Sequence, residues 1–172
     1  LERVASGDKN LEGLRPEDYH LHGERVNEAT SRAWNRLSAL WPRFRASVEA
    51  LHEDQPTTAL TRERWLLPLF DELGFGRLQP LKQAEVIDRK TYPISHSWGQ
   101  VPIHLLGTGI ELDKRTKGTV GAATQSPHSM VQDFLNSSDD HLWGFVSNGQ
   151  TLRILRDNIS MTRQAYVEFD LE

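Results

Sequence analysis

The chain has 172 residues, a formal charge of −4 and no cysteine. Its length and its 37% of hydrophobic residues suit one globular domain and exclude a disordered chain, which could not place so much apolar surface. The absence of cysteine excludes disulfides, thiolate nucleophiles and cysteine-type zinc sites. The net negative charge argues against a domain that binds phosphate backbones by itself, so any contact with nucleic acid is expected to be local or shared.

The chain begins with a lead-in segment, residues 1–24, which mixes glycine, proline and charged residues without a regular period. One short strand is expected there, around residues 19–21. From residue 25 apolar side chains recur every three or four positions, which predicts an amphipathic helix of about 25 residues. Because Pro42 falls inside this pattern and lacks a backbone donor, the helix is expected either to kink there or to be two helices that meet at Trp41.

A second helix is predicted to begin at an N-cap, Thr61, and to end in a left-handed turn at Gly74. The spacing of apolar residues then changes from a helical to a strand period. Residues 84–95 predict a hairpin with a polar turn at residues 88–90.

The strongest strand is predicted at residues 101–106, where an apolar run indicates burial on both faces and a central place in the sheet. Residues 107–125 are rich in glycine, threonine and charge, which predicts a loop. Ser126 and Pro127 are suited to begin a third helix, because proline fits the first helical turn.

The Asn148-Gly149 pair predicts a type I′ turn between two strands, residues 143–147 and 150–156. Residues 165–171 add a last strand. Together these elements predict a single α/β (α+β) domain over residues 25–172, with a central mixed β-sheet flanked by helices.

Metal-dependent DNA cleavage would require clustered carboxylates and a lysine that positions the attacking water. The sequence offers five candidates: Glu85, Asp88, Glu111, Asp113 and Lys114. Their spacing gives no acidic-x-Lys triplet on a strand, and acidic residues beside turns are usually solvated, so the interpretation as surface residues is favoured. The seven histidines show no helical metal-ligand pair, and we predict no metal site.

Two groups of basic residues could contact DNA phosphates. One group lies on the predicted loop and comprises Lys114, Arg115 and Lys117. The other lies near the C-terminal hairpin and comprises Arg153, Arg156 and Arg163. Since solvated basic residues on a strand edge also discourage aggregation, a purely structural role remains open for them.

Residues 126–157, SPHSMVQDFLNSSDDHLWGFVSNGQTLRILRD, resemble the helix and hairpin near the end of a known domain. It is the restriction-endonuclease-like domain at the front of type IIG restriction-modification enzymes and related phage-defence DNA methyltransferases. Residues 61–76 and 92–106 fit the same order, so the resemblance spans roughly residues 16–171. It implies a restriction-endonuclease-like fold and a parent enzyme that methylates adenine in DNA with S-adenosylmethionine, a cofactor bound outside this chain.

The chain departs from that family at the end of the central strand. Where active members carry Glu-x-Lys, this sequence reads Gly107-Thr108-Gly109. Glycines cannot hold a metal ion and a water molecule, so the resemblance implies a degenerate, non-catalytic domain. Such a domain would help the parent enzyme to engage double-stranded DNA or partner subunits of a defence system.

Two alternatives remain open. The first is an active nuclease domain with Mg²⁺ held around Asp88, Glu111, Asp113 and Lys114. The second is a protein-interaction domain without DNA contact.

The sequence also bears on location. No stretch approaches the length of a membrane span, and residues 1–10 have neither a basic start nor an apolar core. We therefore expect a soluble, cytoplasmic protein without membrane contact. Because the first residue is Leu and the last strand-like segment runs to Glu172, we expect a fragment of a longer protein.

Overall fold

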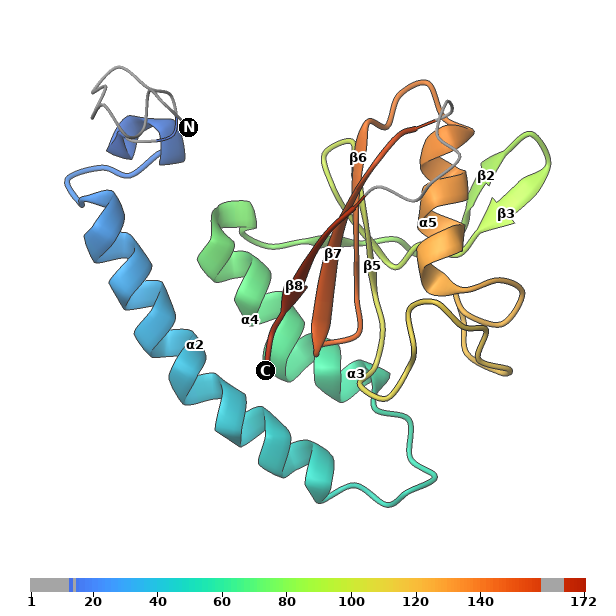
Figure 1. The fold of residues 1–172 in the computed structure, drawn as a ribbon, viewed down its shortest axis with the longest axis horizontal. Helices are drawn as coiled ribbons and strands as arrows, with labels where there is room; N and C mark the ends of the chain where they lie inside the picture. Colours follow the sequence, from blue (N-terminus) through green and yellow to red (C-terminus); the bar gives the residue numbers. More distant parts are fainter. Residues whose placement is uncertain (1–12, 14, 159–165) are drawn as a thin grey trace.

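A six-stranded mixed sheet organises the computed structural model, which describes residues 13, 15–158 and 166–172 (Figure 1). Neighbouring strands are antiparallel except β5 and β6, which are parallel and are joined by a crossover through helix α5 (Pro127–Asn136). The sheet order, with bounds, is β1 (Gln79–Pro80), β4 (His96–Trp98), β5 (Val101–Leu105), β6 (Trp143–Ser147), β7 (Thr151–Arg156) and β8 (Tyr166–Asp170). The expected mixed α/β architecture is confirmed, and residues 101–105 form a central strand as predicted.

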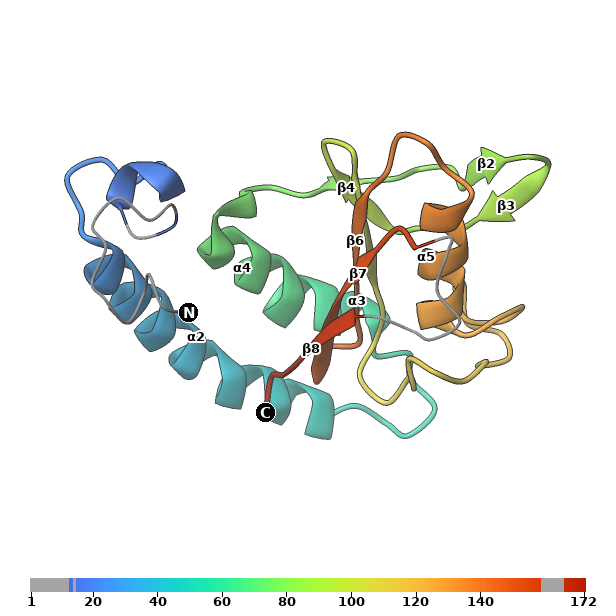
Figure 2. The same cartoon turned by 45° about the horizontal axis from the view of Figure 1, so that its top comes forward.

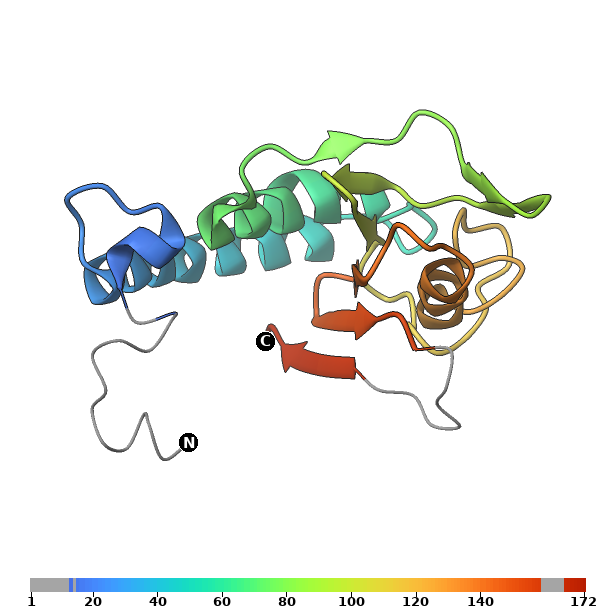
Figure 3. The ribbon, with the colours of Figure 1, turned by 90° about the horizontal axis from the view of Figure 1, so that it is seen from above.

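Helices cover both faces of the sheet. On one side lie α2 (Val26–Glu49) and a second helix, residues 58–75, which run side by side in Figure 3. This second helix joins α3 (Thr58–Thr61), the π-helical η2 (Arg62–Leu66), α4 (Leu67–Phe70) and the π-helical η3 (Asp71–Phe75), and it is continuous up to the left-handed turn at Gly74. On the other side lies α5, with the β2–β3 hairpin beyond it (Figure 2).

Each face of the sheet has its own apolar core. The second helix packs Trp65, Leu66 and Phe70 against Ile103 and Leu105 of β5. The opposite core, beneath α5, is formed by residues from α5, β3, β6, β7 and the 107–125 loop, among them Tyr92, Leu112, Val131, Phe134, Val146 and Leu155. Burial of β5 from both sides explains why its sequence is almost continuously apolar.

Helix α2 is one helix of 24 residues that contains Pro42, so the alternative of two helices meeting at Trp41 is wrong. Its aromatic side chains anchor it to the second helix. The Trp41 ring lies 4.8 Å from that of Trp65, and the Phe44 ring stacks on the same indole at 6.1 Å. This packing stabilises the helix across the missing backbone donor.

The second helix begins earlier than predicted. Thr57 is its N-cap, and Thr61 lies buried inside it, where the Thr61 hydroxyl donates to the Thr57 carbonyl oxygen at 2.9 Å. The prediction of Thr61 as N-cap is therefore wrong, because a threonine within a helix can bond back to the preceding turn instead. The predicted end is confirmed, since Gly74 has a φ of 89°.

Helix α5 begins as predicted. The Ser126 hydroxyl caps it by accepting a hydrogen bond from the Ser129 backbone nitrogen at 3.2 Å, and Pro127 occupies the first turn. The loop at residues 107–125 and a last strand, β8, are confirmed within the described residues. Residue 165, the predicted start of that strand, lies outside them.

The β6–β7 hairpin is confirmed, but its turn differs from the prediction. Gly149 has a φ of 87° and Asn148 has a negative φ, whereas a type I′ turn needs both values positive. The Asn148 side chain determines the turn instead. Its Oδ1 accepts hydrogen bonds from the backbone nitrogens of Gln150 and Thr151 at 3.0 and 2.8 Å.

The hairpin predicted at residues 84–95 is confirmed as β2 (Glu85–Ile87) and β3 (Lys90–Tyr92), which form a separate two-stranded sheet. The strand expected at residues 19–21 is wrong. A short 3₁₀ helix, η1 (Pro16–Tyr19), lies there instead, because Pro16 fits a first helical turn and Asp18 accepts from the Arg15 backbone nitrogen.

Candidate functional site

The acidic residues predicted for a metal site do not gather into one. Asp88 lies in the β2–β3 turn with a φ of 47°, and Glu111 and Asp113 lie on the loop after β5. The described part of the chain contains no group of three or more histidines or carboxylates that could hold a metal ion. Glu111 forms an ion pair with Lys114 at 2.7 Å on the exposed loop.

Asp113 belongs to a paired cluster centred on Arg153. Arg153, on β7, is 6% exposed and donates from both Nη atoms to the Asp113 carboxylate at 2.6 and 2.7 Å. Its Nε donates to Glu168 of β8 at 2.6 Å. The guanidinium lowers the pKa of the Asp113 carboxyl, and Asp113 in turn raises the pKa of Arg153.

Two rings complete this cluster. The Arg153 guanidinium lies 4.5 Å from the centre of the Tyr166 ring, and the Tyr166 ring packs edge-on against His128 at 4.9 Å. Nη1 of Arg153 also lies 3.2 Å from Nδ1 of His128. Burial, and then the Arg153 charge, lower the pKa of His128. The predicted DNA contact Arg153 is therefore engaged inside the domain.

The other predicted basic contacts lie at the surface. Arg115 and Lys117 are exposed on the loop, together with Lys114. Arg156, at the end of β7, is exposed and lies over the Trp143 ring at 5.5 Å. Arg163 is outside the described residues. Four of the predicted DNA-contacting residues thus remain accessible to a phosphate.

A larger candidate site lies where β5 ends and β4 begins, and we call it the basic pocket. It has a volume of about 650 Å³. Four basic side chains line it: Arg62, Lys82, His96 and His104. No aspartate or glutamate is among its lining residues, within the described part of the chain. The pocket is therefore suited to an anion and unsuited to a metal cation.

Arg62 sits on η2 and reaches the end of the central strand. Its Nε and Nη2 donate to the carbonyl oxygen of Leu105 at 2.8 and 2.5 Å. Burial lowers the pKa of Arg62, and no described carboxylate pairs with its charge. These bonds leave Nη1 available to a ligand.

His96 is held by a short chain of hydrogen bonds. The Ser95 hydroxyl donates to the Ile103 carbonyl oxygen at 3.2 Å, accepts from the Leu105 backbone nitrogen at 2.8 Å and contacts Nδ1 of His96 at 2.9 Å. Since the hydroxyl has one proton, this pattern assigns the Nδ1 proton to His96 and leaves Nε2 for other partners. Burial, followed by the charge of Arg62, lowers the pKa of His96 to about 4.

His104 is the central residue of the predicted strand and is 1% exposed. Its ring lies against the backbone of Gly121, and neither ring nitrogen makes a hydrogen bond of good geometry among the described residues. Burial, and then the Arg62 charge, lower its pKa to about 3. A Cβ on Gly121 would lie 2.2 Å from the His104 ring, so only glycine allows the loop to pack so closely.

The sequence interpretation missed the basic pocket. Ser95 and His96 stand side by side in the sequence without any recognisable catalytic motif, and Arg62 lies 43 positions before Leu105, the residue it bonds. The one available signal was His104, a titratable residue inside an otherwise apolar strand.

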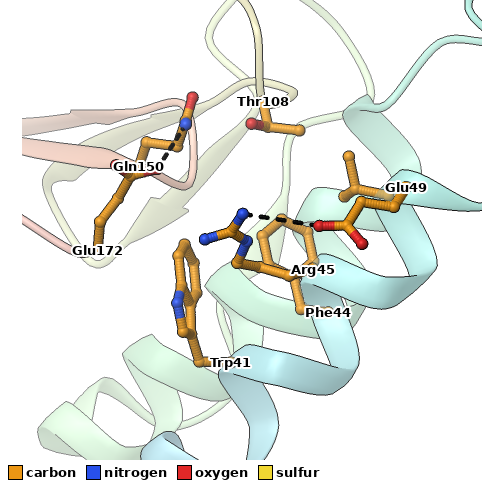
Figure 4. A pocket seen from close by; sticks show the side chains of 8 residues that line it. Trp41, Phe44, Arg45, Glu49, Thr108, Gln150 and Glu172 are labelled. Carbon is orange, nitrogen blue, oxygen red and sulfur yellow. Dashed lines mark hydrogen bonds and ion pairs between the residues drawn. The ribbon is translucent and has the colours of Figure 1, made fainter.

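A second, smaller pocket of about 150 Å³ lies between α2 and the far end of the sheet (Figure 4). Its polar groups are paired with each other. Arg45 and Glu49 form an ion pair at 3.6 Å, and Gln150 donates to Glu172 at 2.7 Å. Because its charges are matched internally, this pocket gives less indication of a ligand than the basic pocket does.

Comparison with known proteins identified no relative: no family model, no curated protein and no solved structure matches the chain. Among the described residues, no helix is long and apolar enough to span a membrane.

Proposed function

We propose that this chain is a nuclease-like domain without cleavage chemistry of its own, belonging to a DNA adenine methyltransferase that uses S-adenosylmethionine. In restriction-modification or phage defence, it would contribute contacts with double-stranded DNA or with partner subunits. The observation that carries the proposal is the basic pocket. At the end of the central strand, where the resembled nucleases carry a carboxylate and a lysine, Arg62 and two histidines line a pocket to which no described carboxylate contributes.

Two further observations support it. Residues 126–157, which carry the resemblance, form α5 and the β6–β7 hairpin, and β6 lies parallel to the central strand. Two of the three carboxylates of the nuclease alternative are also engaged, because Asp113 is bound by Arg153 and Glu111 by Lys114. A metal ion at Asp113 would have to compete with a guanidinium that already holds both carboxylate oxygens.

A DNA-binding assay tests the proposal. The purified chain should shift duplex DNA, and the affinity should fall steeply as salt rises from about 50 to about 300 mM. Replacing Arg115 and Lys117 together by glutamate should weaken binding, because two phosphate contacts are lost. The exposed Arg77, exchanged for glutamate, serves as the matched control. Absence of any salt-sensitive shift would instead favour the protein-interaction alternative.

A cleavage assay tests the missing chemistry. Plasmid incubated with the chain and Mg²⁺ or Mn²⁺ should stay intact. Robust nicking that is lost in Asp113→Ala would overturn the proposal and establish the active-nuclease alternative.

A further inference from the structure

The basic pocket has the size and composition of a ligand site. Its volume of about 650 Å³ lies within the roughly 300–1,000 Å³ range of small-molecule pockets. Apolar side chains form part of its wall, among them Leu81, Ile94 and Val120, while Arg62 and Lys82 supply positive charge. A ligand that matches this lining combines a flat apolar body with a negatively charged group.

Arg62 indicates the charged group. Its guanidinium is partly buried, and no described carboxylate neutralises it, although removing a cation from water is unfavourable unless an anion accompanies it. The remaining Nη1 suits phosphate, because it can donate a charge-assisted hydrogen bond to a phosphate oxygen. Lys82, exposed at the rim, adds a second positive charge without a described partner.

The histidines supply the remaining polar contacts. Nε2 of His96 is not used by the bond to Ser95, and the ring of His104 lines the pocket beside the backbone of Gly121. Hydroxyl and amide groups of Thr58, Gln83 and Thr119 also line the pocket and can bond the edge of a base. The pocket therefore offers donors for a phosphate and both donors and acceptors for a heterocycle.

We propose that the basic pocket binds one phosphate-bearing nucleotide unit, with its phosphate on Arg62 and Lys82 and its base against the wall formed by Leu81 and Ile94. The nucleotide could be free or could be the terminal unit of a DNA strand, since both present the same chemistry. The second source rests on the proposed function, because it requires the domain to meet DNA.

Calorimetric titration with deoxynucleoside 5′-monophosphates tests the site. The nucleotides should bind, and the corresponding nucleosides should bind at least about tenfold more weakly, since a charge-assisted bond contributes more than 1.4 kcal/mol. Arg62→Met should weaken nucleotide binding by at least about tenfold, and Lys82→Glu by about fivefold. Arg77→Glu, an exposed substitution outside the pocket, should have no effect. Because Lys82 is exposed, its variant keeps the test valid if the Arg62 variant folds poorly.

Single-stranded oligonucleotides with and without a 5′-phosphate separate the two sources. Preference for the phosphorylated end would assign the site to a strand terminus, whereas binding of the mononucleotide alone would assign it to a free nucleotide. Failure to bind any nucleotide, or binding unchanged in both pocket variants, would overturn the inference. Salt-sensitive duplex binding without nucleotide binding would overturn this inference and leave the proposed function intact. Arg62-dependent nucleotide binding without duplex binding would contradict the proposed function and leave this inference intact.

Discussion

Two arginines differ in how their charges are matched: Arg153 lies on strand β7, and Arg62 lies on the second helix beside the end of β5. Arg153 is 6% exposed and is matched by Asp113, Glu168 and the ring of Tyr166. Arg62 is partly buried, and among the described residues its guanidinium bonds only to the carbonyl oxygen of Leu105. A charge matched within the fold contributes to stability, whereas a charge left unmatched beside a cavity indicates a ligand. The predictions below test whether this distinction holds.

The largest effect is expected at the matched arginine. Arg153→Met should lower the free energy of unfolding by about 3 kcal/mol, because charge-assisted bonds to two carboxylates are lost from a buried side chain. The loss is at the low end for a buried pair because Asp113 and Glu168 are half exposed and can be hydrated. Urea unfolding measures it, with Arg156→Met as the exposed control. A loss under about 1 kcal/mol would contradict the assignment of a matched cluster.

The second largest loss of stability is expected at Asn148. Its side chain connects the β6–β7 turn to the loop that carries Asp113. Its side chain accepts from two backbone nitrogens and donates to the Ile110 carbonyl oxygen at 2.8 Å. Asn148→Ala should therefore cost about 2 kcal/mol. Asn148→Ser keeps an oxygen that can accept from the turn amides and loses the donor to Ile110, so it should cost less. Equal losses for the two variants would show that the turn does not depend on the Oδ1 contacts.

The pH dependence of stability should report the histidines of the basic pocket. The folded-state pKa values of His96 and His104 are lowered to about 4 and about 3 from an ordinary 6.5. Below pH 6.5 the unfolded chain therefore binds protons that the folded chain does not, and stability falls with falling pH. The contribution of His104 is at most about 1.4 kcal/mol per pH unit.

Urea unfolding between about pH 7.5 and about pH 5.5 measures this slope, above the range in which most carboxylates titrate. His128, whose pKa is also lowered, adds to it. His104→Asn should reduce the slope. An unchanged slope in the His104 variant would show that the buried ring takes up its proton in the folded state.

The smallest effect is expected at the unmatched arginine. Arg62→Met should lower stability by only about 1 kcal/mol, because loss of the two bonds to Leu105 is offset by removal of a desolvated charge. Comparing its urea midpoint with that of Arg153→Met completes the test. If the two variants lose equal stability, the basic pocket is a structural feature and its unmatched charge has no bearing on ligands.

Much of the fold could be predicted from the sequence because local patterns determine it. Alternating and continuous apolar runs gave the strands, and Ser126-Pro127 marked the start of α5. The predictions failed where a side-chain hydrogen bond determined the local backbone geometry. Asn148 bonds the turn through its own carbonyl oxygen, and Thr61 bonds back to Thr57 inside a helix.

The candidate site was much less predictable. Arg62, His96 and His104 come together only when the second helix packs across the end of the sheet, and no spacing in the sequence encodes that contact. Arg153 was expected at the surface because charged residues in strands usually are exposed. Its burial depends on Glu168, the residue opposite it on β8, and on Asp113 from a distant loop.

Gly149 has a consequence for the evolution of this domain. The Trp65 indole nitrogen donates to the Gly149 carbonyl oxygen at 2.8 Å, and a Cβ on Gly149 would stand 2.6 Å from Cγ2 of Thr61. The hairpin turn therefore rests directly on the helix residue that precedes Arg62. Homologous chains that acquire a side chain at position 149 should carry a smaller residue at position 61. Covariation between these two positions would therefore indicate that the turn and the second helix stay in contact.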